Sequence, residues 1–196
     1  MRLAWLRPAV HAGALGFVFL APALGKWGMA GAASGAFLVN AFLLPWTPFG
    51  RALRREGESW WNGTLSYPLA VALGYALFSE EIAGIAWAVL ALGDPAAALV
   101  GGLRPWRIRI PWNRRKSVAG SLAFLAVAWA AAAGLLVATS ATADLNGPLL
   151  LFLGAMALAG TLAETLPIPP DDNLPVLLAA GGLGFAVEQV LAAAGC

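Results

Sequence analysis

Asp94 is a carboxylate in a stretch where an acidic side chain is costly. It lies in Gly93-Asp94-Pro95-Ala96-Ala97, within a long apolar run, and an ionisable residue at membrane depth usually marks a functional site or a buried pair. Its small neighbours leave room for a ligand to approach. Phosphoryl transfer to an alcohol needs a carboxylate to take the hydroxyl proton or to hold a metal ion. Asp94 could serve as the base or as the metal ligand. The alternative is a structural role, in which Asp94 is a buried hydrogen-bond partner that fixes helix packing.

The segment before residue 118 concentrates positive charge. Residues 104–116 include six basic side chains and no acidic one. Lys116 and Ser117 come just before a predicted helix, and the free N–H groups at a helix N-terminus suit a phosphate. A topology signal, attraction to anionic lipid headgroups and a plain helix cap at Ser117 are the alternatives. There is no Gly-x-x-x-x-Gly-Lys-[Ser/Thr] stretch, so this is not a Walker A site.

Three further carboxylates lie near the C-terminal predicted helix. Asp171 and Asp172 are adjacent and follow Glu164 by a few residues. In phosphate sites Mg²⁺ is usually held by one or two carboxylates together with substrate oxygens. We therefore interpret Asp171 and Asp172 as metal-site or nucleotide-site residues. Asn173, directly before a predicted helix, is interpreted as its cap.

Composition excludes a soluble domain. Hydrophobic residues make up 60% of the 196 residues and charged residues 11%, against about 45–50% and about 25% in soluble domains. The net charge of +2 is too small to indicate nucleic-acid binding. The single cysteine, Cys196, cannot form an intramolecular disulfide or a cysteine-based metal site. We expect one membrane-embedded, all-α domain, 1–196.

The hydrophobic pattern predicts about seven transmembrane helices, each needing about 20 residues. The first is interpreted as a retained span and not a signal peptide, because His11 interrupts its apolar run. The predicted spans are 8–25, 27–45, 62–79, 82–102, 118–139, 148–166 and 174–194.

The basic residues predict the orientation of these spans. Eleven of the twelve fall in loops on one side, and Lys26 is the exception. The positive-inside rule then places the N-terminus in the cytoplasm and the C-terminus outside. We expect a multi-pass protein of the inner membrane whose polar site faces the cytoplasm.

Several motifs taken in order resemble a known family. They are Arg7-x-x-x-His11-x-Gly13, Arg55-Glu56-Gly57 followed by Tyr67-Pro68, Gly93-Asp94-Pro95-Ala96-Ala97, Lys116-Ser117-x-x-Gly120-Ser121, and Glu164 before Asp171-Asp172-Asn173-Leu174-Pro175. Together they resemble the CTP-dependent phytol kinases and dolichol (polyprenol) kinases, to which some fungal-type diacylglycerol kinases are similar. The resemblance runs from residue 7 to residue 175.

The resemblance implies specific roles for these residues. It implies catalytic roles for Asp94, Lys116 and Glu164, and a Mg²⁺ ion held by Asp94, Asp171 and Asp172. It implies that the basic loop binds the CTP triphosphate through Arg114, Arg115, Lys116, Ser117, Gly120 and Ser121. His11, Arg55, Glu56 and Asn173 are further site candidates. On the residues alone, His11 is a structural histidine on the face of Arg7, and Glu56 belongs to a solvated charge cluster.

The expected function is transfer of the terminal phosphate of CTP to the hydroxyl of an isoprenoid alcohol dissolved in the bilayer, with release of CDP. A CTP-dependent diacylglycerol kinase and a phosphatidate cytidylyltransferase, which releases pyrophosphate, are the enzymatic alternatives. The alternative from another class is a small transporter with buried carboxylates. It is disfavoured because the outer halves of the predicted spans are nearly free of polar residues.

Overall fold

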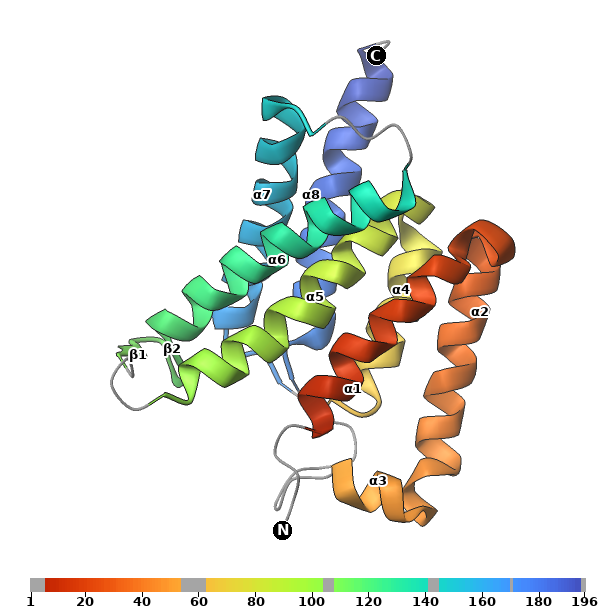
Figure 1. Cartoon of the computed structure of the whole chain (residues 1–196), viewed down its shortest axis with the longest axis vertical. Coiled ribbons are helices and arrows are strands. Elements are labelled where there is room, and N and C mark those ends of the chain that lie inside the picture. The colour runs from red at the N-terminus through yellow and green to blue at the C-terminus, as the bar shows by residue number, and fades with distance from the viewer. Residues whose placement is uncertain (1–5, 54–62, 104–107, 141–144, 170, 195–196) are drawn as a thin grey trace.

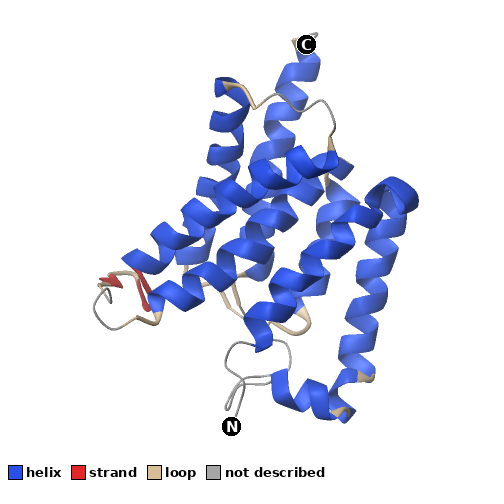
Figure 2. Ribbon diagram, in the orientation of Figure 1, coloured by secondary structure: helices blue, strands red, loops and turns tan. Residues whose placement is uncertain are grey.

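The computed structural model is almost entirely helical (Figure 2). It describes residues 6–53, 63–103, 108–140, 145–169 and 171–194, so Arg55 and Glu56 lie outside the described residues. The helices are α1 Leu6–Ala14, η1 Leu15–Leu20, α2 Ala21–Phe42, η2 Leu44–Trp46, α3 Pro48–Leu53, α4 Ser66–Leu77, α5 Glu80–Gly101, α6 Val118–Thr139, α7 Gly147–Thr165 and α8 Asn173–Ala193. The predicted all-α fold is confirmed apart from one antiparallel hairpin, β1 Arg109–Ile110 and β2 Asn113–Ser117.

Long apolar helices agree with the predicted membrane protein. Five helical stretches among the described residues are long and apolar enough to cross a membrane: 6–42, 80–101, 118–139, 147–165 and 173–193. Helix α4, predicted as the span 62–79, has 12 residues and is apolar but shorter. The last four predicted spans agree with α5–α8 to within two residues at each end.

The stretch 6–42 is two antiparallel arms and not one rod. Gly25 has a φ of 65°, in the left-handed region that favours glycine. There the chain turns back, so that α1 with η1 forms one arm and the rest of α2 forms the other (Figure 1). The break predicted between the spans 8–25 and 27–45 lies at this position.

The helices run back and forth between two ends of the molecule (Figure 1). Helix α1 begins at the lower end of that view, and α8 finishes at the upper end. The hairpin, the C-terminal end of α5 and the N-terminal end of α6 also lie at the lower end. Residues far apart in the sequence therefore meet there, including described residues from several of the motifs.

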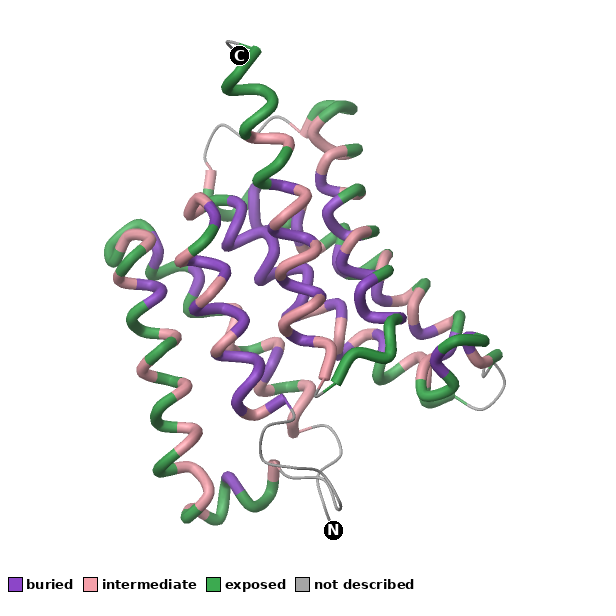
Figure 3. Tube along the Cα trace, turned by 180° about the vertical axis from the view of Figure 1, so that it is seen from behind, coloured by how far each residue is buried: buried purple, intermediate pink, exposed green. Residues whose placement is uncertain are grey.

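Helix α5 is the centre of the fold. It packs against α6, α8 and α1, and most of its length is buried (Figure 3). Close helix crossings depend on glycine: a Cβ on Gly93 would lie 2.7 Å from the fully buried ring of Phe124. A Cβ on Gly120 of α6 would lie 3.1 Å from the carbonyl oxygen of Ala97 and 3.3 Å from the Cα of Gly101. Small residues at such crossings let helix backbones approach in lipid.

Side-chain caps fix where two of these helices begin. The Asn146 side chain accepts a hydrogen bond from the Leu149 amide at 3.0 Å, at the start of α7. The Ser117 hydroxyl accepts one from the Gly120 amide at 3.2 Å, at the start of α6. Each cap satisfies a backbone donor that has no partner within its helix. The predicted cap role of Ser117 is thus confirmed, and it fixes the position of the adjacent Lys116.

Candidate active site

A polar pocket of about 840 Å³ lies at the lower end of the fold. It is bounded by the ends of α5 and α7, the β hairpin, the start of α6 and the connection from α7 to α8, and Arg7 of α1 reaches it. Of the predicted site residues, it brings together Asp94, Arg115, Lys116, Ser117, Gly120, Glu164, Asp171 and Asp172. Segments far apart in the sequence, from Arg7 to Asp172, therefore contribute to one pocket.

Lys116 joins two of the carboxylates in this pocket. Its Nζ donates a hydrogen bond to Oε1 of Glu164 at 2.6 Å and another to Oδ2 of Asp172. Glu164 is only 2% exposed, and its other oxygen accepts a hydrogen bond from Ser121 at 3.3 Å. Because an unpaired buried carboxylate is costly, the contact with Lys116 stabilises Glu164 at this position.

The same contacts change the proton affinity of Lys116. Burial by itself favours the neutral amine, but the adjacent carboxylates of Asp172 and Glu164 more than offset it and raise the pKa of Lys116. The lysine is therefore charged at neutral pH. Since its pKa is higher in the folded state, its contribution to stability is complete below the ordinary lysine pKa and is lost as the pH rises above it.

Asp94 faces the polar pocket from α5. Its side chain is 30% exposed, although most residues of this helix are buried. The nearest nitrogen of His11 on α1, Nδ1, lies 3.6 Å from Asp94 Oδ2. This distance is too long for a hydrogen bond, but the two groups form an ion pair when His11 is protonated.

Two aromatic residues fix the position of His11. The Tyr67 ring lies 4.2 Å from the His11 ring, centroid to centroid, and its hydroxyl donates to the His11 carbonyl oxygen at 3.0 Å. Trp87 Nε1 in turn donates to the Tyr67 hydroxyl at 2.8 Å. Tyr67 was part of a quoted motif, but nothing in the sequence indicated its contact with His11 or with Trp87.

Asp171 ties two helices together. Its carboxylate accepts hydrogen bonds from the Ser66 hydroxyl and the Gly63 amide, at the start of α4, and from the Asn173 amide at 3.2 Å. The Asn173 side chain donates to the Ser66 hydroxyl at 2.9 Å. Asn173 is the first residue of α8, so the predicted cap role of its side chain is wrong, and it links α8 to α4 instead.

Other predicted residues lie at or beyond the edge of the pocket. Arg114 is exposed on β2 and does not line the pocket, and Ser121 contributes only through Glu164. The sequence did not single out Arg109 and Asn113, which do line it. Both residues reach the pocket because the hairpin brings β1 beside β2. Nothing in the sequence of this loop predicted that the two strands would pair.

The pocket has carboxylates that suit a magnesium ion shared with a phosphate. Among the described residues, no group of three or more His, Cys, Asp or Glu side chains is arranged to hold a metal alone. Asp94 and Asp172 nevertheless line the same pocket, and phosphate-bound Mg²⁺ needs only one or two carboxylates. Asp171 already accepts hydrogen bonds from Gly63, Ser66 and Asn173, which makes it the weaker candidate.

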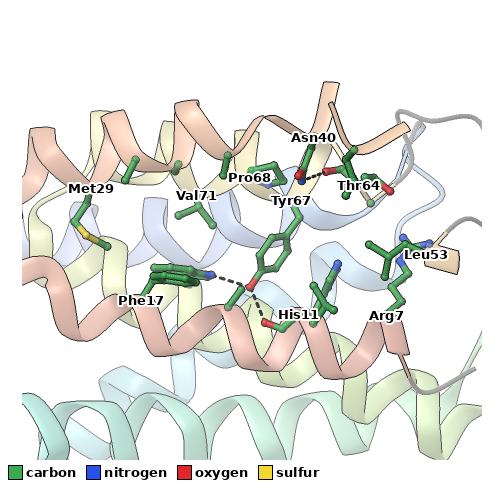
Figure 4. A pocket seen from close by; sticks show the side chains of 18 of the residues that line it. Arg7, His11, Phe17, Met29, Asn40, Leu53, Thr64, Tyr67, Pro68 and Val71 are labelled. Carbon is green, nitrogen blue, oxygen red and sulfur yellow. Dashed lines mark hydrogen bonds between the residues drawn. The ribbon is translucent and has the colours of Figure 1, made fainter. Parts of the chain in front are cut away.

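An apolar cavity of about 330 Å³ lies between the two arms, α1 with η1 and α2, and is closed on a third side by α4 (Figure 4). His11 and Tyr67 line it, and Arg7 lines both this cavity and the polar pocket. An oily cavity and a charged pocket therefore adjoin at Arg7 and at the His11–Asp94 pair.

Comparison with known proteins supports the resemblance indicated by the motifs. The chain is similar to a protein of Glycine max described as "Probable phytol kinase 1, chloroplastic", with 31% identity over 144 residues. The matched region is 69% of this chain and 47% of the relative, so the chain spans about half the length of that protein. No family model matches the chain, and no solved structure matches it significantly.

The Lys116 contacts predict a specific loss of stability. In Lys116→Met, the buried Glu164 and its neighbour Asp172 lose their cation, and the free energy of unfolding should fall by about 3–5 kcal/mol. Adding Glu164→Gln should recover part of the loss, because an amide needs no counter-ion. Thermal unfolding in detergent measures all three proteins. Arg114→Met, which removes an exposed cation from the same strand, is the control and should change little. An unchanged melting temperature in Lys116→Met would contradict the pairing.

Proposed function

We propose that this protein is a lipid kinase that transfers the terminal phosphate of a nucleoside triphosphate to the hydroxyl of a membrane isoprenoid alcohol. One observation carries the proposal: Asp94 faces a charged pocket, while its partner His11 lines an adjoining apolar cavity. A water-soluble phosphate donor and an oily acceptor could therefore meet at Asp94. The similarity to a probable phytol kinase supports the same chemistry.

The polar pocket suits a triphosphate. Arg7, Arg109, Arg115 and Lys116 supply positive charge around it, and its volume of about 840 Å³ is within the range of about 300–1,000 Å³ typical of ligand sites. The N-terminus of α6 adds free backbone N–H groups. We propose CTP as the donor, a choice that rests on the family resemblance of the motifs.

In the proposed reaction, Asp94 accepts the proton of the acceptor hydroxyl as its oxygen attacks the terminal phosphorus. The bond from that phosphorus to the bridging oxygen breaks, and the nucleoside diphosphate leaves with the electron pair. Lys116 stabilises the negative charge that develops on the phosphate oxygens. Asp172, which lines the same pocket, would hold Mg²⁺, and the ion would neutralise phosphate charge when bound.

His11 would act by positioning. It lies against Asp94, and its ring and backbone are both held by Tyr67. A carboxylate held in one orientation loses less entropy when the hydroxyl arrives, and such positioning contributes to catalysis.

The activity test combines a panel of acceptors with a carboxylate variant. With CTP labelled at the terminal phosphate, phytol and other isoprenoid alcohols should become labelled and CDP should be released, whereas diacylglycerol should not react. Asp94→Asn should lower the rate about 10²–10⁴-fold, and chelation of Mg²⁺ should abolish it.

Glu81→Gln is the matched control, since Glu81 is exposed in the first turn of α5, and it should keep full activity. Near-normal turnover in Asp94→Asn would contradict the role of Asp94. Labelled diacylglycerol, or release of pyrophosphate, would identify one of the alternative enzymes.

We further propose that the chain crosses the membrane seven times, with the polar pocket in the cytoplasm. Helices α1, α2, α4, α5, α6, α7 and α8 alternate in direction between the two ends (Figure 1). The described basic residues other than Lys26 lie at the end that holds the polar pocket. The positive-inside rule supports a cytoplasmic location for this end.

Cysteine labelling tests this orientation. In a Cys196→Ser background, Arg114→Cys marks the hairpin and Ala193→Cys marks the end of α8, and both positions are exposed. A membrane-impermeant maleimide applied to intact bacterial cells should label the cysteine at 193 and reach that at 114 only after permeabilisation. The opposite pattern would place the polar pocket outside the cell.

A further inference from the structure

We infer that the apolar cavity between α1 and α2 binds the hydrocarbon tail of the acceptor, as a single isoprenoid chain that enters from the bilayer between the two arms. This inference rests on the proposed function and names the acceptor subsite.

The cavity has one polar end. Arg7, His11, Asn40 and Thr64 lie together at one end of it, whereas Phe17 and Met29 lie toward the other (Figure 4). The rest of the lining is apolar, with side chains such as Leu20, Leu24, Ala33 and Val71. An amphiphile with one polar headgroup and an uncharged tail matches this distribution. A charged or evenly polar ligand does not, because burying its polar groups against hydrocarbon is costly.

The apolar end opens to the outside of the molecule. Phe17, Leu20 and Leu24 line the cavity, yet they are 63%, 46% and 46% exposed. They belong to η1 and to the start of α2, on the segment that leads into the turn at Gly25. The arms themselves pack on different neighbours, α1 on α5 and α2 on α4, which keeps them apart along their length. A tail dissolved in lipid can thus enter sideways between them.

The dimensions favour one chain. Helix α1 rises about 1.5 Å per residue and η1 about 2.0 Å, so His11 and Leu20 are roughly 16 Å apart along the arm. The volume of about 330 Å³ is at the low end of the range for ligand sites, about 300–1,000 Å³. A long, narrow cavity of this size suits a single isoprenoid chain better than the two acyl chains of a diacylglycerol.

The polar end meets the proposed site of phosphate transfer. His11 lies 3.6 Å from Asp94, and Arg7 belongs to the linings of both the cavity and the polar pocket. A hydroxyl at this end is therefore next to the carboxylate proposed to take its proton. Asn40 holds this end together by donating a hydrogen bond to the Thr64 carbonyl at 2.9 Å, which joins α2 to the start of α4.

Photocrosslinking without nucleotide tests the subsite independently of turnover. The probe is farnesol carrying a diazirine at the end of its tail, added to the full chain in lipid nanodiscs. Peptide mapping should find the label between Phe17 and Met29. Ala14→Phe and Ala33→Phe, which fill the cavity from opposite arms, should each reduce this labelling about tenfold or more.

Ala126→Phe is the matched control, because Ala126 is exposed on α6 and lines neither pocket, and it should label as the wild type does. Thermal unfolding verifies that each variant is folded, and two cavity variants guard against failure of one. Label confined to residues outside the cavity lining, or full labelling in both folded cavity variants, would overturn the subsite.

The outcomes also separate this inference from the proposed function. Cavity labelling without phosphorylation of any alcohol supports the subsite and overturns the kinase. Phosphorylation of isoprenoid alcohols with the label confined to residues outside the cavity lining overturns the subsite and supports the kinase.

Discussion

Lys116 supplies the positive charge that lets two carboxylates, Glu164 and Asp172, stand at the edge of an apolar helical bundle. Each of the three residues comes from a different element, so the contacts also tie the hairpin to α7 and to the start of α8. The arrangement pairs a single cation with two carboxylates. It is also easily remodelled by a ligand, since phosphate oxygens compete with the same carboxylates for the lysine.

The other residues of the site are positioned by the packing of the helices around α5. Gly120 and Gly101 let α5 and α6 approach closely, which brings Lys116 beside the helix that carries Asp94. Trp87 of α5 donates a hydrogen bond to the Tyr67 hydroxyl, and this hydroxyl donates to the His11 carbonyl oxygen, which holds His11 beside the same carboxylate. Asp94 therefore lines the charged pocket, while its neighbour His11 lines the apolar cavity. That is the arrangement required by a reaction between a soluble phosphate donor and an acceptor that stays in the membrane.

The sequence predicted most of the helices because long apolar runs separated by prolines and charges leave few alternatives. It also selected Asp94 and Glu164, since charge at membrane depth is rare. Lys116 was selected because it comes just before a helix, and Asp172 because it is adjacent to Asp171. It could not predict the hairpin that adds Arg109, whose strands are too short to show alternation, or the true partner of Asn173. The apolar cavity was also beyond sequence reasoning. Its lining residues look like any lipid-facing surface until the turn at Gly25 sets the two arms apart.

The central claim is that Asp94 lies between a phosphate-binding pocket and a lipid-binding cavity. The most direct measurement is a crystal structure of the protein with farnesol and a CTP analogue whose terminal phosphate cannot be transferred. The account predicts the terminal phosphate at Lys116 and the farnesol hydroxyl within hydrogen-bond distance of Asp94, with the tail between α1 and α2. A nucleotide bound outside the polar pocket, or a hydroxyl on the far side of the bundle from Asp94, would contradict it.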